Sequence, residues 1–391
     1  MPLIETPVEE LQFGMYVSKL DRPWTETPFM FQGFVLGNEK QLDALKKFCQ
    51  HVFVDSEKED KSVAAASVRG TTVHKETATL DVELPRARSA ITKGSVVIQH
   101  VAHAVEMGDA IDSAKVTEAA SEITDSVLRN PDAATLLVQM QAKSGETFER
   151  AIYVSVMMSI FGRFLQLTKE SIANLGLLGL LQDSGKLHLP NHLLTKIEPL
   201  TAEEEALYRT HVEQSVKILN GTPGLPVELP GLATLHHEHY DGSGYPRGLR
   251  GGAIAMAGMI AGIVDAFDNC VAPRPYGKQM SPSDALSLIY KGRGTRFQPA
   301  LAEQFIQCLG VYPVGCAVEL NTGEIGVIIA QNTLRLKPRV MVVKDAKGFE
   351  NRPFRLLDLS KDPKASPTEP YKIRRTLGYD AVKIDPRELF L

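Results

Sequence analysis

The sequence predicts a mainly α-helical protein with a small α/β module at its start and a β extension at its end. Apolar residues recur at helical spacing through the middle of the chain. Short extended segments flank one helical segment near the N-terminus, and apolar and polar residues alternate near the C-terminus. We expect an N-terminal α/β domain with a polar linker in residues 1–95, a helical domain in residues 96–311, and a β extension and tail in residues 312–391.

In the N-terminal part, residues 15–20 and 52–55 are expected to form short strands, with a helix between them within residues 38–50. Residues 56–95 are polar with little apolar periodicity. They predict a linker, with one added strand at residues 79–84.

Amphipathic patterns predict helices at residues 96–107 and 113–129. The Asn130-Pro131 pair ends the second of these, and Asp132 is the expected cap of the next helix. Further helices are expected at residues 152–165, 171–181 and 202–219. Alternation predicts strands at residues 316–320, 326–329 and 339–343, with a hairpin turn at Asn321-Thr322-Gly323.

The composition is that of an ordinary globular protein, with 43% hydrophobic and 23% charged residues. The net charge of −4 does not favour a nucleic-acid polymer or a membrane surface as a partner. The four cysteines form no CxxC pair, which fits a reducing compartment. The start of the chain does not resemble a signal peptide, and no apolar run reaches about 18 residues. We therefore expect a cytoplasmic protein without a membrane span.

The most informative segment is residues 232–252, LATLHHEHYDGSGYPRGLRGG. The adjacent histidines His236 and His237 are followed by two acidic residues and then by a glycine-rich loop: Glu238, Asp241, Gly242, Gly244 and Gly248. Neutral imidazoles are common metal ligands, and glycines allow the backbone to approach a ligand closely. Two adjacent histidines alone could be a chance surface pair, but the combination is far more specific.

Two further segments carry candidate carboxylates. An apolar helix ends near Asp183, which could bridge metal ions, and Lys186 follows and could hold a phosphate. Alternatively, this segment is an ordinary helix end with Gly185 as its cap. Asp265 and Asp268 are three residues apart and share one side of a predicted helix, which could equally be a solvated face.

These motifs, together with His211 on a separate helix, resemble the HD-GYP family. The order QDSGK, His211, HHEHYDGSGYP, DAFD and RPY is similar to that of the family, and the resemblance covers residues 140–310. This family is a helical group of phosphohydrolases that hydrolyse cyclic di-GMP. Residues 14–34 resemble the small domain that often precedes it, and residues 312–328 resemble its usual C-terminal β extension.

The resemblance implies a role for each matching residue. It implies metal ligation by Asp183, His211, His236, His237 and Asp265, with Glu146 as an extra carboxylate ligand in some members. It assigns catalysis to Asp183 and Lys186. It assigns substrate binding to Gly244, Tyr245, Pro246, Asp268, Arg274 and Lys278, although Gly277 occupies the position where the family often has a basic residue.

The sequence departs from the family pattern at two positions. Gln182 stands where the name-giving histidine is expected, and Arg150 stands at a further histidine ligand. One ligand set, formed by Asp183, His211, His236 and His237, is complete, whereas the other retains only two aspartates. A guanidinium cannot ligate a cation. Arg150 could replace the missing ion by pairing with Asp183 or Asp265, or it could pair with Glu146 on the helix surface.

We therefore expect one divalent transition metal ion, iron, manganese or zinc, instead of two. Three functions remain open. The chain is expected to bind cyclic di-GMP with weak or no phosphodiesterase activity. It could alternatively be an active metal-dependent phosphodiesterase that forms pGpG or GMP, or a phosphohydrolase for another nucleotide. The expected partners are cyclic di-GMP, a signalling protein such as a diguanylate cyclase, and a second copy of the chain.

Overall fold

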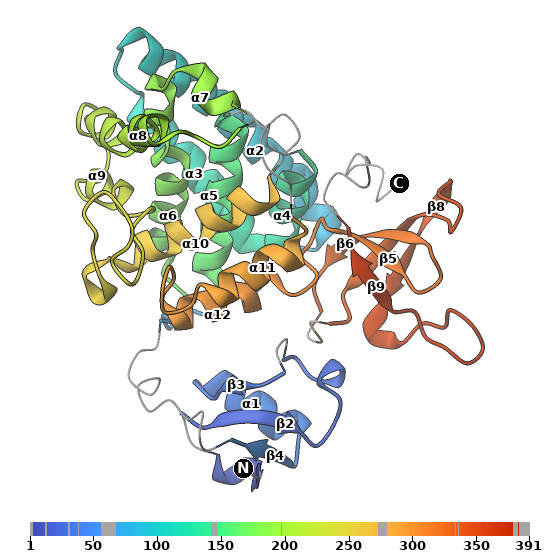
Figure 1. Ribbon diagram of the computed structural model, residues 1–391. Helices are drawn as coiled ribbons and strands as arrows, with labels where there is room; N and C mark the ends of the chain where they lie inside the picture. Colours follow the sequence, from blue (N-terminus) through green and yellow to red (C-terminus); the bar gives the residue numbers. More distant parts are fainter. Residues whose placement is uncertain are drawn as a thin grey trace.

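The structure is a computed structural model that describes residues 3–11, 14–29, 32–37, 39–55, 68–141, 147–196, 198–272, 280–332, 334, 336–377 and 382. A small N-terminal α/β sheet, a helical region and a C-terminal antiparallel sheet follow one another along the chain (Figure 1). The predicted fold class is therefore confirmed.

The N-terminal module is a four-stranded antiparallel sheet with one helix. Its strand order is β1 (Ile4–Pro7), β4 (His51–Val54), β2 (Tyr16–Leu20) and β3 (Phe34–Val35), and helix α1 (Glu39–Phe48) connects β3 to β4. Val17, Leu36, Leu45 and Val52 are fully buried in a core that belongs to this module alone. The alternation along β2 and β4 creates this core because every second side chain of a strand faces the same side.

The helical region begins with long helices and ends with shorter ones. Its helices are α2 (Leu80–Met107), α3 (Ser113–Arg129), α4 (Pro131–Gln141), α5 (Thr147–Phe164), α6 (Lys169–Leu181), α7 (Asn191–Thr195), α8 (Ala202–Asn220), α9 (Leu229–Ala233), α10 (Met256–Val271), α11 (Pro282–Lys291) and α12 (Pro299–Leu309). Helices α5 and α6 are apolar on nearly all sides and lie in the centre, as expected for helices without a solvent face. Gly179 allows their close approach, because a Cβ atom there would lie 2.7 Å from the Ser155 Cα.

Two local predictions are wrong. The strand expected at residues 79–84 is the first turn of α2, which starts at Leu80 and buries Leu84 and Ala87, so the linker expected to extend to residue 95 is helical over residues 80–95. Polar residues obscured this helix, since its buried side includes Glu83, which accepts hydrogen bonds from Ser126 and Arg129 of α3. The cap of α4 is Asn130 and not Asp132: Asn130 Oδ1 accepts from the backbone N–H of Ala133 at 3.2 Å.

The C-terminal sheet is antiparallel throughout. Its strand order is β8 (Glu350–Asp358), β7 (Arg339–Lys344), β6 (Ile325–Ala330), β5 (Ala317–Leu320) and β9 (Ile373–Thr376). The three predicted strands correspond to β5, β6 and β7, and Gly323 adopts a φ of +82° in the predicted turn. The buried side chains of this sheet belong to the same apolar core as the helices. In the described part of the chain, no helix is both long and apolar enough to span a membrane.

A candidate metal centre

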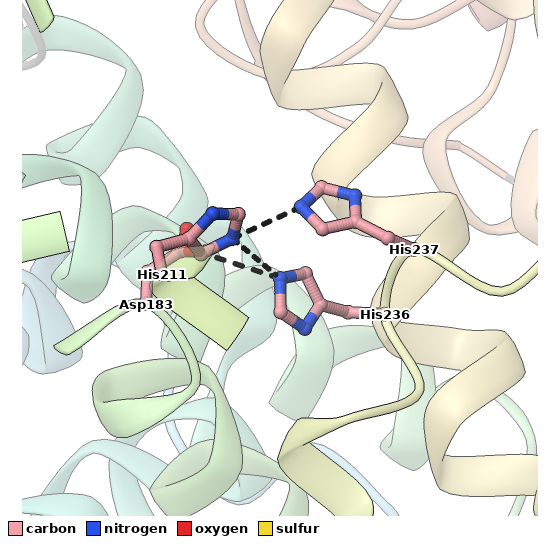
Figure 2. Close-up of side chains that lie close together, drawn as sticks. All are labelled: Asp183, His211, His236 and His237. Carbon is pink, nitrogen blue, oxygen red and sulfur yellow. Dashed lines mark hydrogen bonds and ion pairs between the residues drawn. The ribbon is translucent and has the colours of Figure 1, made fainter. Parts of the chain in front are cut away.

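Four side chains from three separate segments converge on one point. Asp183 follows α6, His211 lies on α8, and His236 and His237 follow α9. One donor atom from each lies within 4.8 Å of those of the others, and Figure 2 shows the three rings and the carboxylate facing one another. The Asp183 Oδ1 lies 3.5 Å from the His211 Nε2 and 3.4 Å from the His236 Nε2. The ligand set expected from the sequence is thus assembled in space.

The turn after α6 is shaped to present Asp183 to α8. The helix ends at Leu181, and the 3-10 helix η5 (Ser184–His188) starts directly after Asp183. The Gly185 N–H donates to the Ser215 Oγ of α8 at 2.8 Å. A Cβ atom on residue 185 would lie 2.1 Å from the His211 carbonyl oxygen, so this contact requires glycine. Gly185 is therefore not simply a helix cap.

The histidine tautomers favour a cation at this point. The Nδ1 atoms of His211 and His236 lie 2.6 and 2.8 Å from the carbonyl oxygens of Tyr208 and Ala233, so each Nδ1 carries the proton. Both Nε2 atoms are then lone-pair acceptors, although they lie only 3.5 Å apart. Two acceptors that face each other in a buried space repel unless a cation lies between them. Three imidazoles and one carboxylate suit a divalent transition ion, and the residues therefore fit the metal implied by the sequence.

Burial keeps these imidazoles in the neutral form that can bind a metal ion. The loss of hydration lowers the pKa of His211 to about 4, and the nearby Lys186 ammonium acts in the same direction. Burial, followed by the neighbouring His236, also holds the pKa of His237 well below its ordinary value. A neutral imidazole is the form that binds a metal, so neither ring needs to lose a proton at neutral pH.

Lys186 is buried beside Asp183. Its Nζ donates to the Asp183 Oδ2 at 2.7 Å, which leaves Oδ1 facing the histidines. Burial alone would raise the pKa of the Asp183 carboxyl, but the Lys186 ammonium and the nearby imidazoles hold it well below its ordinary value. Lys186 therefore orients the carboxylate and keeps it ionised, whereas its expected contact with a phosphate stays a prediction.

Arg150, in the first turns of α5, reaches a group of three aspartates. Its Nη2 donates to the Asp265 Oδ1 at 2.6 Å, its Nη1 lies 3.2 Å from the Asp268 Oδ2, and its Nε lies 3.7 Å from the Asp183 Oδ2. The predicted pairing with Asp183 or Asp265 is confirmed. The alternative partner, Glu146, lies outside the described residues.

The arginine changes the electrostatics of these aspartates. Burial alone would raise the pKa of the Asp265 carboxyl, but the Arg150 guanidinium holds it below its ordinary range. The other Asp265 oxygen accepts from the Asn269 Nδ2 at 2.8 Å and lies 3.9 Å from the His237 Nδ1. Asp265 therefore lies beside the four-donor group, against Arg150, and is not a member of it. Asp268 is buried next to the same guanidinium.

Gln182 occupies the position before Asp183. Its side chain is fully buried, and neither its Oε1 nor its Nε2 has a hydrogen-bond partner among the described residues. Such an orphaned amide is costly in a protein interior.

The glycine-rich loop after the histidines folds back against His237. A Cβ atom on Gly244 would lie 2.4 Å from the His237 carbonyl oxygen, so this glycine allows the loop to fold back on the metal ligands. The Glu238 carboxylate accepts from the backbone N–H groups of Arg247 and Leu249 and fixes the loop. The Tyr245 ring stacks on the His237 ring at 4.6 Å, while Pro246 is exposed. The roles of Gly244, Tyr245 and Pro246 in substrate binding stay predictions.

A cavity of about 490 Å³ adjoins His237, and it is lined by residues that the sequence analysis did not select. His237 lies in its wall together with Leu200, Thr201, Ala202, Glu205, Tyr208 and Asn269. Tyr208 precedes His211 by three residues on α8, and Asn269 follows Asp265 by four on α10, so helical spacing was the available signal for these two; Glu205, six residues before His211, had no such signal. Arg274 and Lys278, which were expected to bind substrate, lie outside the described residues.

A helical domain with a histidine–aspartate centre of this kind defines the class of the protein. A family model described as "HD domain" matches residues 132–301, and one described as "Domain of unknown function (DUF3391)" matches residues 3–116. The cyclic di-GMP phosphodiesterase PA4108 of Pseudomonas aeruginosa is 30% identical over 91% of this chain and 88% of its own length. The chain therefore belongs to the same family of HD-domain proteins as this phosphodiesterase.

Two other relatives match a smaller share of the chain. The cyclic di-GMP phosphodiesterase response regulator RpfG of Xanthomonas campestris is 33% identical over 37% of this chain and 38% of its own length. The 3'3'-cGAMP-specific phosphodiesterase 2 of Vibrio cholerae is 35% identical over 32% of this chain and 24% of its own length. Both matches support the family assignment. The first relative is named for cyclic di-GMP and the second for 3'3'-cGAMP, so members of the family are named for different cyclic dinucleotides.

Proposed function

We propose that this protein is a phosphodiesterase that hydrolyses cyclic di-GMP with a single divalent metal ion. The ion is held by Asp183, His211, His236 and His237. The observation that carries this proposal is the convergence of four donor atoms whose tautomers and charges already suit a cation. The likeness to PA4108 over most of both chains supports cyclic di-GMP as the substrate.

When bound, a divalent ion would act as a Lewis acid toward the phosphodiester and would help to activate a water molecule. The chain contributes the remaining functions. Lys186 keeps Asp183 ionised, and Asn269 and Arg150 fix Asp265 beside the centre. In the reaction, water adds its hydroxyl to phosphorus, one P–O bond to a ribose breaks, and the proton ends on the released 3' oxygen. The product is the linear dinucleotide pGpG.

The second candidate is a receptor that binds cyclic di-GMP without hydrolysing it, the function placed first in the sequence analysis. It is favoured by Arg150, whose guanidinium lies among three carboxylates close to the ligand set. The complete four-donor group and the phosphodiesterase relatives favour the enzyme at least as strongly.

The test compares the wild-type protein with His236→Ala and with His100→Ala, an exposed histidine of α2 that serves as the control. Elemental analysis should find about one iron, manganese or zinc per chain in the wild type and the control, and none in His236→Ala. Hydrolysis of cyclic di-GMP, followed by the appearance of pGpG, should be lost only in His236→Ala.

The possible results separate the candidates. A protein that holds the ion and binds cyclic di-GMP but never yields pGpG is the receptor. Metal content that is unchanged in His236→Ala would contradict the ligand assignment. Two tightly bound ions per wild-type chain would contradict the single-ion centre.

A further inference from the structure

The cavity beside the metal ligands has a charged residue at a distance that suits recognition of a nucleobase. Glu205 lies in its wall six residues before His211 on α8, which corresponds to about 9 Å along the helix axis. A phosphodiester at the metal ligands therefore leaves space for its nucleoside to extend along α8 toward this carboxylate.

A series of contacts between flat groups leads from His237 to Glu205. The Tyr245 ring stacks on His237, and the Arg209 guanidinium lies over the Tyr245 ring, 4.5 Å from its centre. The Arg209 Nε then donates to the Glu205 Oε1 at 2.9 Å. His237, a proposed metal ligand, and the Glu205 carboxylate are thus connected through Tyr245 and Arg209, and both members of the Arg209–Glu205 pair stay partly exposed, so the carboxylate is accessible to a ligand.

The chemistry of a carboxylate distinguishes the two purines. An ionised glutamate only accepts hydrogen bonds, and its two oxygens offer about four lone-pair sites, so one Arg209 bond does not exhaust it. Guanine presents two adjacent donors on its Watson–Crick edge, the N1–H and the N2 amino group. Adenine presents one amino donor next to the N1 lone pair, which a carboxylate repels. A site built for a donor pair rejects an analogue that lacks it.

We propose that Glu205 selects guanine as the base next to the phosphodiester that is cleaved. This inference rests on the proposed function and names the feature of the substrate that this chain recognises. Tyr208, which also lines the cavity, supplies an aromatic face near the same base.

The test measures kcat/KM for cyclic di-GMP, 3'3'-cGAMP and cyclic di-AMP with the wild type, Glu205→Gln and Glu213→Gln. Glu213 lies on the same helix with a largely exposed side chain, and it provides the matched control. The wild type and the control should prefer cyclic di-GMP over cyclic di-AMP by at least about tenfold. A glutamine both donates and accepts, which matches the adenine edge, so Glu205→Gln should shift the preference toward the adenine-containing substrates.

The readout is a ratio between substrates measured on one protein sample, so partial misfolding of the variant does not affect it. Dissociation constants for the same three dinucleotides are measured in parallel with metal-depleted protein. Hydrolysis with equal kcat/KM for the three substrates, or an unchanged preference in Glu205→Gln, overturns the role of Glu205 but leaves the phosphodiesterase intact. If the metal-containing protein shows no hydrolysis but binding is selective for guanine and depends on Glu205, this inference is supported and the proposed function is refuted.

Discussion

The largely buried guanidinium of Arg150 should limit how much further positive charge the centre can accept. Asp183, Asp265 and Asp268 carry three negative charges, and Arg150 and Lys186 already balance two of them. One divalent ion at the histidines is enough to reverse the remaining charge. A second divalent ion at Asp265 would lie next to a fixed cation, which is unfavourable in a poorly solvated site.

At the residue scale we predict that the double change Arg150→His and Gln182→His creates a second metal site. It removes the fixed cation, and it supplies two imidazoles beside Asp183 and Asp265. Each single change should do little, because one retains the guanidinium and the other lacks a ligand, so the effects should be strongly non-additive. Elemental analysis of all four proteins should find about two ions only in the double variant.

The variant Arg150→Met serves as a control for charge alone. It leaves Asp265 and Asp268 buried without their cation and should destabilise the fold by about 3–5 kcal/mol, measured by urea denaturation. If the double variant folds and still holds one ion, then charge and ligand number do not limit the number of metal ions that the centre binds. Two bound ions in either single variant would also contradict this explanation of the single-ion centre.

At the scale of elements, the contact between η5 and α8 sets the position of Asp183 relative to His211. Gly185 is packed so closely on α8 that an added Cβ would meet the His211 carbonyl oxygen at 2.1 Å and the Ser215 nitrogen at 2.5 Å. Both are backbone atoms, so the contact can only be relieved if one element moves away from the other. Such a movement would separate the carboxylate from the imidazoles.

We therefore predict that Gly185→Ala weakens metal binding and lowers the free energy of unfolding by about 1–3 kcal/mol. Titration of the metal-depleted protein with zinc or manganese would measure the first effect, and urea denaturation the second. Gly231→Ala is the matched control, since a Cβ there meets no atom within 4 Å and the residue is helical. Unchanged metal affinity in Gly185→Ala would show that the η5–α8 contact does not set the ligand geometry.

At the scale of the whole molecule, the described residues form two separate apolar cores. One belongs to the N-terminal module, and the other is shared by the helices and the C-terminal sheet. The four proposed metal ligands all lie in the second unit. A ligand that binds only the folded form stabilises the unit that binds it.

We predict that metal shifts one unfolding transition and not the other. The single tryptophan, Trp24, packs on the core of the N-terminal module, so its fluorescence reports that module, whereas circular dichroism at 222 nm reports mainly the helices. At 100 times its dissociation constant, the metal should stabilise the helical unit by about 2.7 kcal/mol and leave the tryptophan transition unchanged. Equal shifts of both signals would mean that the two cores unfold as one cooperative unit.

The sequence by itself determined the fold class and most helices, and its resemblance to a known family pointed to the four side chains that form the candidate metal site. Helices such as α3 and α8 are encoded by periodicity and capping within a few residues, and the three histidines with Asp183 stand in a recognisable motif. The start of α2 was missed because Glu83, a charged residue, occupies a buried position of this helix where the pattern would need an apolar residue. Its hydrogen-bond partner, Arg129, lies on α3 and could not be identified from the local sequence. Strands β8 and β9 were missed as well. Their exposed faces carry many charged residues and give no clear apolar alternation.

Only the tertiary structure decided which charges meet. The sequence left Arg150 with either a surface partner or buried aspartates. The structure places its guanidinium against Asp265 and Asp268 of α10 and near Asp183 after α6. It likewise brought Glu205 to a cavity that begins at His237. Periodicity and capping act between residues a few positions apart, whereas these contacts join segments up to more than a hundred residues apart. They depend on how the helices pack, which no local pattern encodes.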